Sequence, residues 1–220
     1  MAVPTLFQLG RQAVEQALRR CADDPDLPCL AAVDGTCGNG GDTLFLAKTL
    51  ASFGGKPYGL FAFDVQEAAL EATRARLERG GFSEYVRLVP HSHARLREML
   101  GDTEAFPPLL RETESPLRIA AAMYNLGFLP RSDKRVTTVA GHTLASLDAA
   151  AAALACGGIL AVHAYGGHPG GREELEAVDS WCTALPFDEW TAARYTLCNK
   201  PRNPEALFLV GREQRRERTE

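Results

Sequence analysis

Apolar positions along the chain recur with two different periods, one typical of helices and one of strands. Residues 5–21 carry apolar side chains at helical spacing after Thr5, which predicts an N-terminal helix. Short apolar runs follow, bounded by glycine, proline and polar residues, and they predict strands over 30–33, 58–63, 85–89, 119–124 and 159–164. The segments between and after them predict helices over 42–51, 66–79, 138–155 and 172–185.

The order of these predicted elements indicates an α/β fold. Strands that alternate with helices through short connections are typical of a parallel sheet with helices on both faces. The last two strand-like runs, 190–197 and 206–210, have no predicted helix between them and are expected to pair as an antiparallel hairpin. A mostly parallel seven-stranded sheet with such a C-terminal hairpin is the outline of the class I S-adenosylmethionine-dependent methyltransferase (Rossmann-like) fold. We expect a single domain over 1–220, with a charged tail over 212–220 and a connection over 101–116 whose role the sequence leaves open.

Composition and charge narrow the class of protein. Of the 220 residues, 45% are hydrophobic and 24% are charged, as in folded globular proteins. The 24 Lys and Arg against 28 Asp and Glu give a net charge of −4, which excludes a uniformly basic nucleic-acid coat but not a local basic patch. The six cysteines form no C-x-x-C pair, so neither a structural zinc nor a disulfide framework is expected. Without a signal-peptide pattern or a long apolar run, we expect a cytoplasmic protein with no membrane contact and no metal.

The turn after the first predicted strand, from Asp34 to Thr43, is the most informative segment. Its glycines let the backbone approach a nucleotide-like ligand closely, because they lack a Cβ atom. Thr43 stands where the dinucleotide fingerprint G-x-G-x-x-G requires its last glycine. The Asp34 carboxylate would repel a pyrophosphate and attract a cationic sulfonium donor with a free amino group. We therefore expect S-adenosyl-L-methionine rather than NAD as the cofactor, bound near Asp34, Gly38, Asn39 and Gly41.

Polar residues after the next two predicted strands are further candidates for cofactor binding. Asp64 follows the second strand, where α/β nucleotide-binding proteins place a carboxylate that accepts the ribose hydroxyls, and Gln66 could reach the same sugar or the adenine. The alternative is that Asp64 only caps the helix that follows. Ser92 and His93 follow the third strand and could contact the adenine or the methionine part; alternatively, the histidine is an exposed loop residue.

Three motifs together resemble a known family. These are the glycine-rich segment 34–43, the N-L-G-F-L-P segment 125–130 and the Y-G-G-H-P-G-G segment 165–171. In these motifs, and over nearly the whole chain, the sequence resembles the bacterial rRNA methylase family, whose better-defined members are tRNA 5-aminomethyl-2-thiouridine methyltransferases. The resemblance implies a class I fold, S-adenosylmethionine as methyl donor and methylation of the aminomethyl group on the tRNA wobble uridine. It also implies cofactor contacts at Asn39, Gly41, Asp64, Gln66, Ser92 and His93.

Methyl transfer to an amine requires the neutral amine, because an ammonium group has no lone pair with which to attack. Asn125 follows the fourth predicted strand, and its amide oxygen could accept an amine N–H, while Phe128 could flank the uracil ring. Asp133, Tyr165 and His168 are candidates for accepting the proton, and His168 also for binding the substrate. Each also has a structural interpretation: Asp133 could pair with a neighbouring cation, Tyr165 could be a core aromatic, and His168 could brace the turn that follows it.

A short run of cations, Arg131, Lys134 and Arg135, directly follows the substrate motif and would place positive charge beside the active site. We expect these residues to hold phosphates of a tRNA anticodon loop, although such a charge run is also typical of a solvated surface. Rival functions are a methyltransferase for ribosomal RNA or a small-molecule amine, and a non-catalytic nucleotide-binding protein on the same fold. A homodimer is a further assembly that the sequence leaves open.

Overall fold

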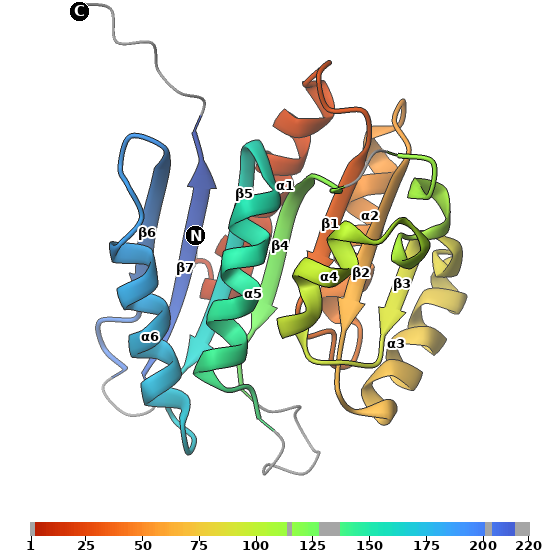
Figure 1. Cartoon of the computed structure of the whole chain (residues 1–220). Helices are drawn as coiled ribbons and strands as arrows, with labels where there is room; N and C mark the ends of the chain where they lie inside the picture. The colour runs from red at the N-terminus through yellow and green to blue at the C-terminus, as the bar shows by residue number, and fades with distance from the viewer. Residues whose placement is uncertain (1–2, 114–115, 128–136, 201–203, 214–220) are drawn as a thin grey trace, which may run out of the picture.

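The computed structural model describes residues 3–113, 116–127, 137–200 and 204–213. Within these ranges the chain forms one sheet of seven strands in the order β3-β2-β1-β4-β5-β7-β6 (Figure 1). The strands are β1 (Leu30–Asp34), β2 (Tyr58–Phe63), β3 (Val86–Val89), β4 (Ile119–Asn125), β5 (Leu154–Tyr165), β6 (Trp190–Thr196) and β7 (Glu205–Arg212). Strands β1 to β5 run parallel, and β7 lies antiparallel between β5 and β6. The predicted fold class is confirmed, including the C-terminal antiparallel hairpin.

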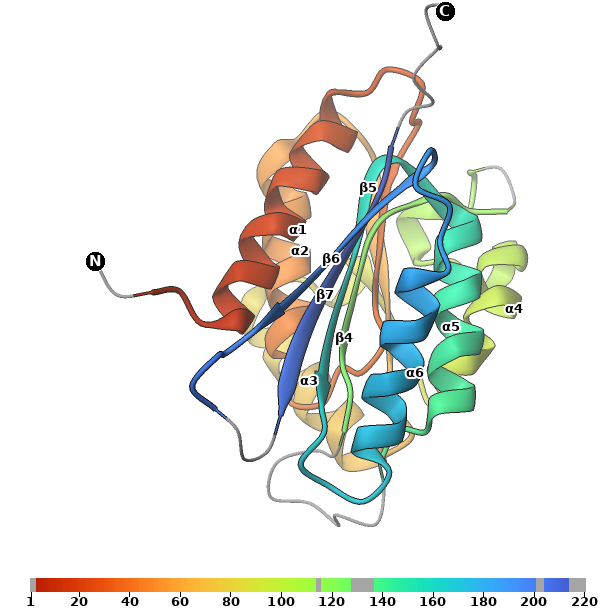
Figure 2. The same cartoon turned by 90° about the vertical axis from the view of Figure 1, so that its left-hand side faces the viewer.

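Helices cover both faces of this sheet, as the view along its edge shows (Figure 2). One face carries α1 (Leu6–Asp23), α2 (Gly41–Phe53) and α3 (Glu67–Gly80), and the other carries α4 (Leu96–Gly101), α5 (Ala140–Ala153) and α6 (Gly171–Thr183). Each layer has its own apolar cluster of buried side chains, which includes Leu18, Leu46 and Leu77 on the first face and Leu96, Leu147 and Val178 on the second. Burial of these two clusters against the sheet is the main force that holds the layers together.

The N-terminal helix begins where the sequence predicts it. Thr5 accepts a hydrogen bond from the backbone N–H of Gln8 at 3.2 Å, and the Gln8 side chain accepts one from the Thr5 N–H at 2.9 Å. This reciprocal capping box satisfies two N–H groups that a helix start leaves without partners. The first turns of α1 then pass beside β7, where an added Cβ on Gly10 would lie 3.3 Å from the side chain of Leu207.

The predicted helix over 138–155 is too long. Helix α5 ends at Ala153, and β5 begins at Leu154, which pairs with Ile119 of β4. Two guanidinium groups donate to the Leu154 carbonyl, from Arg118 at 3.1 Å and from Arg212 at 2.7 Å. Leu154 and Ala155 therefore enter the sheet because tertiary pairing outweighs their helix propensity.

The connection after β3 contains short helices that the sequence analysis did not predict. Besides α4, the described part of the segment 101–116 forms two 3₁₀ turns, and both Phe106 and Leu110 are fully buried. The Phe106 ring meets the edge of Phe61 in β2, with 6.4 Å between ring centroids. The role of this connection is thus to complete the apolar layer over β2. Within the described ranges, no helix combines the length and apolarity that crossing a bilayer requires.

Candidate functional site

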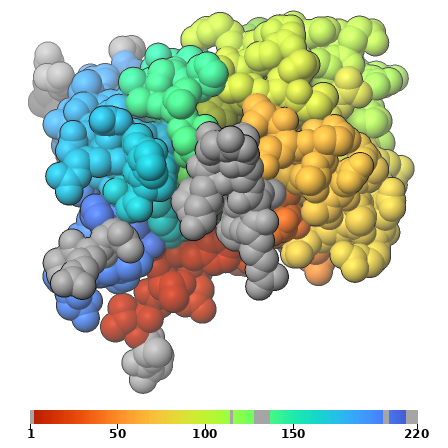
Figure 3. All heavy atoms as spheres, turned by 90° about the horizontal axis from the view of Figure 1, so that it is seen from below, coloured from red at the N-terminus to blue at the C-terminus, as the bar shows by residue number. Residues whose placement is uncertain are grey.

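A cavity of about 950 Å³ opens at the edge of the sheet where the parallel strands end. Figure 3 views the molecule from this side, with the start of α1 in red close to the C-terminal elements in blue. The volume lies in the range of pockets that bind cofactors and small substrates. Its lining includes ten of the residues predicted for the site, namely Gly38, Asn39, Gly41, Asp64, Gln66, Ser92, His93, Asn125, Tyr165 and His168.

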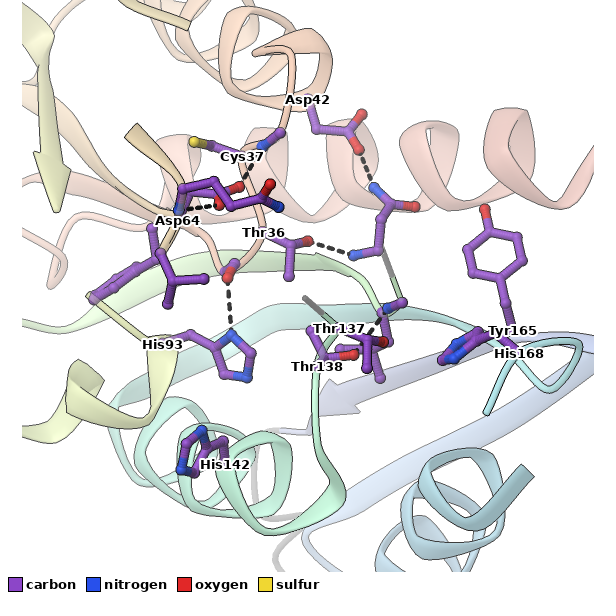
Figure 4. A pocket seen from close by; sticks show the side chains of 18 of the residues that line it. Thr36, Cys37, Asp42, Asp64, His93, Thr137, Thr138, His142, Tyr165 and His168 are labelled. Carbon is purple, nitrogen blue, oxygen red and sulfur yellow. Dashed lines mark hydrogen bonds between the residues drawn. The ribbon is translucent and has the colours of Figure 1, made fainter. Parts of the chain in front are cut away.

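Asp64 fastens the glycine-rich turn to the end of β2. Its carboxylate accepts the N–H of Gly38 at 3.0 Å and the N–H of Gln66 at 2.9 Å (Figure 4). Gly40 has a φ of 74°, and a Cβ there would lie 2.9 Å from the backbone of Thr73, so the turn requires glycine at this position. Asp64 is therefore not the cap residue of α3, which is Gln66; its carboxylate instead joins the glycine-rich turn to the residues that follow β2.

Asp34 does not line the cavity in the described structure. It is buried, and its carboxylate accepts the Thr36 N–H at 3.1 Å and the Thr43 hydroxyl at 2.6 Å. Burial, with the nearby carboxylate of Asp42, raises the pKa of Asp34 to about 7. The predicted direct attraction between Asp34 and a bound cation is therefore not supported, because this carboxylate points into the loop and ties its two ends together. Thr43, the departure from the dinucleotide fingerprint, is one of these ties.

His93 lines the cavity and carries a buried hydrogen-bond acceptor. Its Nδ1 lies 3.0 Å from the carbonyl oxygen of Gly35, which can only accept, so Nδ1 carries the proton. Burial lowers the pKa of His93 to about 4, which keeps the ring neutral at physiological pH. Its Nε2 is therefore an unprotonated acceptor, buried and without a hydrogen-bond partner among the described residues. Gly35 has no room for a side chain, since a Cβ would lie 2.2 Å from Cε1 of Tyr124.

Asn125, at the end of β4, is held by two other segments. Its backbone N–H donates to the Thr36 hydroxyl at 2.7 Å, and its side-chain NH₂ donates to the carboxylate of Asp42 in α2. Asp42 in turn accepts from Arg11 of α1, with distances of 2.9 Å from Nε and 2.7 Å from Nη2. Because a carboxylate can only accept, the amide orientation is fixed, with the Asn125 NH₂ towards Asp42 and the Oδ1 available to the cavity.

Tyr165 and His168 lie at the other end of the cavity from Asp64 and His93 (Figure 4). The Tyr165 hydroxyl lies 3.0 Å from Nδ1 of His163, and burial raises the pKa of Tyr165 to about 12. Nδ1 of His168 lies 3.0 Å from the carbonyl oxygen of Pro169, and a Cβ on Gly171 would lie 2.7 Å from Nε2 of His168. His168 therefore packs closely against the turn before α6, as its structural interpretation predicted, and also lines the cavity.

Five predicted site residues lie outside the described residues: Phe128, Arg131, Asp133, Lys134 and Arg135. The described residues on either side of them are paired, since the Gly127 N–H donates to the Thr138 hydroxyl at 2.8 Å and the Thr138 N–H donates to the Gly127 carbonyl at 3.0 Å. The buried Glu174 of α6 accepts from the hydroxyls of Thr138 and Thr143. Gly127, at the described end of the N-L-G-F-L-P segment, is thereby linked through Thr138 to Glu174 of α6.

Several cavity residues were missed by the sequence analysis. Asp42 belongs to the quoted glycine-rich motif, but the sequence gives no sign that it contacts Asn125. His142 of α5 lies 3.3 Å, through Nδ1, from the Ser92 hydroxyl, and Glu205 enters the cavity wall from the start of β7. Among the described residues, no group of three His, Cys, Asp or Glu side chains is arranged to hold a metal ion.

The strand order, the glycine-rich turn and the cavity at the strand ends together define a class I methyltransferase fold. The chain belongs to the family described as "Putative rRNA methylase", whose family model matches residues 60–211. It is 34% identical over 186 residues to the chloroplastic tRNA (mnm(5)s(2)U34)-methyltransferase of Arabidopsis thaliana. That match covers 82% of this chain but only 63% of the length of the plant protein.

Solved structures of similar proteins share the fold over nearly their whole length. A "putative rRNA-methylase" from Clostridium thermocellum has a TM-score of 0.76 at 24% identity, with 96% of this chain and 100% of that chain covered. A "putative methyltransferase" from Streptococcus mutans, solved in complex with SAH, has a TM-score of 0.75 at 27% identity, with 96% and 99% covered.

Proposed function

We propose that this protein is an S-adenosylmethionine-dependent methyltransferase that converts 5-aminomethyl-(2-thio)uridine at the tRNA wobble position into 5-methylaminomethyl-(2-thio)uridine. The observation that carries the proposal is the fixed Asn125 amide, whose oxygen is an acceptor for an amine N–H in the cavity that the glycine-rich turn also lines. The name of the plant relative supports the substrate, and the SAH complex of the Streptococcus mutans protein supports the cofactor.

The residues of the cavity fit this cofactor. The Asp64 carboxylate keeps lone pairs for ribose hydroxyls beyond the two backbone N–H groups that it accepts. Nε2 of His93 is a buried acceptor whose missing partner an amino group of the cofactor would supply. When bound, the cofactor supplies a methyl group that is attached to a sulfonium sulfur. Because the neutral thioether is a good leaving group, the protein mainly has to position the amine and exclude water.

Asn125 would act on the amine directly. Its Oδ1 accepts one N–H of the neutral aminomethyl group and thereby directs the nitrogen lone pair, while Asp42 prevents the amide from turning. A neutral amide is suited to this task because it neither protonates the amine nor stabilises the unreactive ammonium form as a carboxylate would.

The mouth of the cavity is suited to a nucleoside. Three exposed apolar side chains lie on its lining: Phe7 is 38% exposed, Val65 59% and Val139 48%. An unstacked RNA base is bound by such apolar and aromatic surfaces. The tRNA phosphates would be held by Arg131, Lys134 and Arg135, which stay a prediction because they lie outside the described residues. Replacing these three by glutamine should weaken tRNA binding and flatten its salt dependence.

A direct test is to incubate the purified protein with labelled S-adenosylmethionine and one of three acceptors: tRNA that lacks the final methyl group, ribosomal RNA, or a small primary amine. We expect label in the wobble nucleoside, its loss in Asn125→Ala, and normal labelling in the control Asn199→Ala, whose side chain is exposed and outside the cavity lining. Label only in another acceptor would replace the proposed substrate. Cofactor binding without any transfer would contradict catalysis.

A further inference from the structure

Behind Tyr165 lies a chain of polar groups that have no role yet in the proposed methyl transfer. His163 precedes Tyr165 by two residues in β5, so both side chains lie on the same face of the strand. Their rings stack with 4.3 Å between centroids, and the Tyr165 hydroxyl lies 3.0 Å from Nδ1 of His163. On the other side of the imidazole, Nε2 lies 3.5 Å from Oε2 of Glu205, and Oε1 of Glu205 lies 2.8 Å from Nζ of Lys200.

The pairing of the strands builds this chain. In the antiparallel β5–β7 pair Tyr165 is opposite Glu205, so the carboxylate reaches the side of the imidazole that faces away from Nδ1. In the parallel β4–β5 pair His163 is level with Asn125. Tyr165, Glu205 and Asn125 consequently line one cavity, while His163 is buried behind them with 6% exposure.

These contacts favour one placement of the protons. Nε2 of His163 makes no hydrogen bond among the described residues, and the Glu205 carboxylate 3.5 Å away is the charge that favours the tautomer with the proton on Nε2. Nδ1 is then an acceptor, and the Tyr165 hydroxyl donates its proton to it. The Tyr165 oxygen consequently offers only lone pairs to the cavity, as the Asn125 oxygen does. A group with several N–H bonds is the ligand that two such acceptors suit.

We infer that Tyr165, His163 and Glu205 form a proton-accepting chain that deprotonates the attacking ammonium group of the substrate. The inference rests on the proposed function. Tyr165 touches the substrate, and His163 and Glu205 act through it as positioning residues.

The proton moves in two coupled transfers. The ammonium N–H gives its proton to the Tyr165 oxygen while the Tyr165 O–H proton passes to Nδ1 of His163, which becomes an imidazolium beside the Glu205 carboxylate. The lone pair left on nitrogen then forms the bond to the methyl carbon as the bond from that carbon to sulfur breaks, leaving a neutral thioether and a secondary ammonium product. His163 afterwards returns its proton to solvent.

Charges from several elements act on His163. Burial lowers its pKa, Glu205 of β7 and Asp42 of α2 oppose that shift, and Lys200 adds to it. The ring is thus neutral when the substrate arrives, and the Glu205 carboxylate is the main charge that would stabilise its protonated form. Tyr165, whose pKa is raised to about 12, passes the proton on and does not persist as a phenolate.

The test measures single-turnover methyl transfer between pH 6 and pH 9.5 for the wild-type protein, Tyr165→Phe and His163→Gln. We expect both variants to be about 100-fold slower at pH 7. The deficit should shrink as pH rises towards the pKa of about 10.4 of a free alkylamine, because solvent then removes the proton. Tyr195→Phe, on the exposed strand β6, is the matched control and should follow the wild-type profile.

A second readout needs no activity. Imidazole ¹⁵N NMR of the protein without ligands, with His163→Gln used for assignment, should show His163 protonated at Nε2 and not at Nδ1. The opposite tautomer, a deficit that is equal at every pH, or normal rates in both variants would each overturn the inference while leaving the proposed function intact. Absence of transfer by the wild-type protein on any acceptor would instead overturn the proposed function, and the proton-accepting role with it.

Discussion

The side-chain amide of Asn125 donates a hydrogen bond to the carboxylate of Asp42, which is itself held by two nitrogens of Arg11. The contact links the end of β4 to the starts of α2 and α1. It also orients the amide that we assign to the amine. Asp42 is 6% exposed, so water competes little for this pair.

Replacing Asp42 by asparagine should slow methyl transfer. The new amide can donate as well as accept, so the Asn125 side chain is free to turn its NH₂ towards the substrate. We expect kcat to fall about 10- to 100-fold, with a smaller change in cofactor affinity. Asp179→Asn, which alters a surface pair with Arg194, is the control for single-turnover measurements. An unchanged rate in Asp42→Asn would contradict the role of this contact.

Replacing Asp64 by alanine should weaken cofactor binding. The substitution removes the acceptor of two backbone N–H groups in the cavity wall as well as the expected contacts to the ribose. Hydrogen bonds to a charged group contribute about 1.5–3 kcal/mol each, so calorimetric titration should show at least a tenfold loss of affinity for S-adenosylmethionine. Asp179→Ala should bind like the wild-type protein. Equal affinities in all three proteins would exclude Asp64 from the cofactor site.

Gly35→Ala should destabilise the fold. The added methyl group would lie 2.2 Å from Cε1 of Tyr124, a side chain that is itself fully buried. We expect a loss of about 1–3 kcal/mol in the free energy of unfolding, measured by urea denaturation. Gly141→Ala in α5 meets no atom within 4 Å and should be neutral or stabilising, since alanine favours the helix. If Gly35→Ala were as stable as this control, the packing described here would be wrong.

His93 should make the stability depend on pH. Its pKa is lowered from 6.5 to about 4 by burial, so the unfolded chain binds more protons between these values. Its contribution is therefore fully present above pH 6.5 and is lost as pH falls towards 4, by about 3 kcal/mol in all. Asp34, with its raised pKa, contributes with the opposite sign, so the comparison has to be made with His93→Gln.

The difference in unfolding free energy between the wild-type protein and His93→Gln should accordingly grow from pH 4 to pH 7. Urea titrations at several pH values measure it. A difference that does not change with pH would mean that His93 is exposed to solvent.

The sequence predicts most of the site residues that lie at the ends of strands. Asp64 and Asn125 each follow or end an apolar run, and parallel strands bring such positions to the same edge of a sheet. The glycine-rich turn can also be predicted from the sequence, because a close backbone approach restricts the residue type. The boundary between α5 and β5 was misplaced, because alanines near Leu154 carry helix propensity and only the pairing with Ile119 overrides it.

Local sequence patterns do not predict the contacts between segments that are far apart in the chain. The direction of the Asp34 carboxylate depends on Thr43 folding back over it, and a pattern of charges alone suggested that it faces a ligand. Glu205 reaches His163 only through the register of the β5–β7 pair, and Asp42 reaches Asn125 only when the start of α2 meets the end of β4. A single sequence specifies these pairings through the complete fold and not through local spacing.

Mass analysis of tRNA nucleosides from cells that lack this protein tests the proposed methylation in the cell. We predict that 5-methylaminomethyl nucleosides disappear from the wobble position and that the 5-aminomethyl precursor accumulates in their place. The wild-type chain should restore the methylated nucleoside and Asn125→Ala should not. Wobble nucleosides that stay fully methylated in the absence of the protein would show that this chain does not catalyse the proposed methylation.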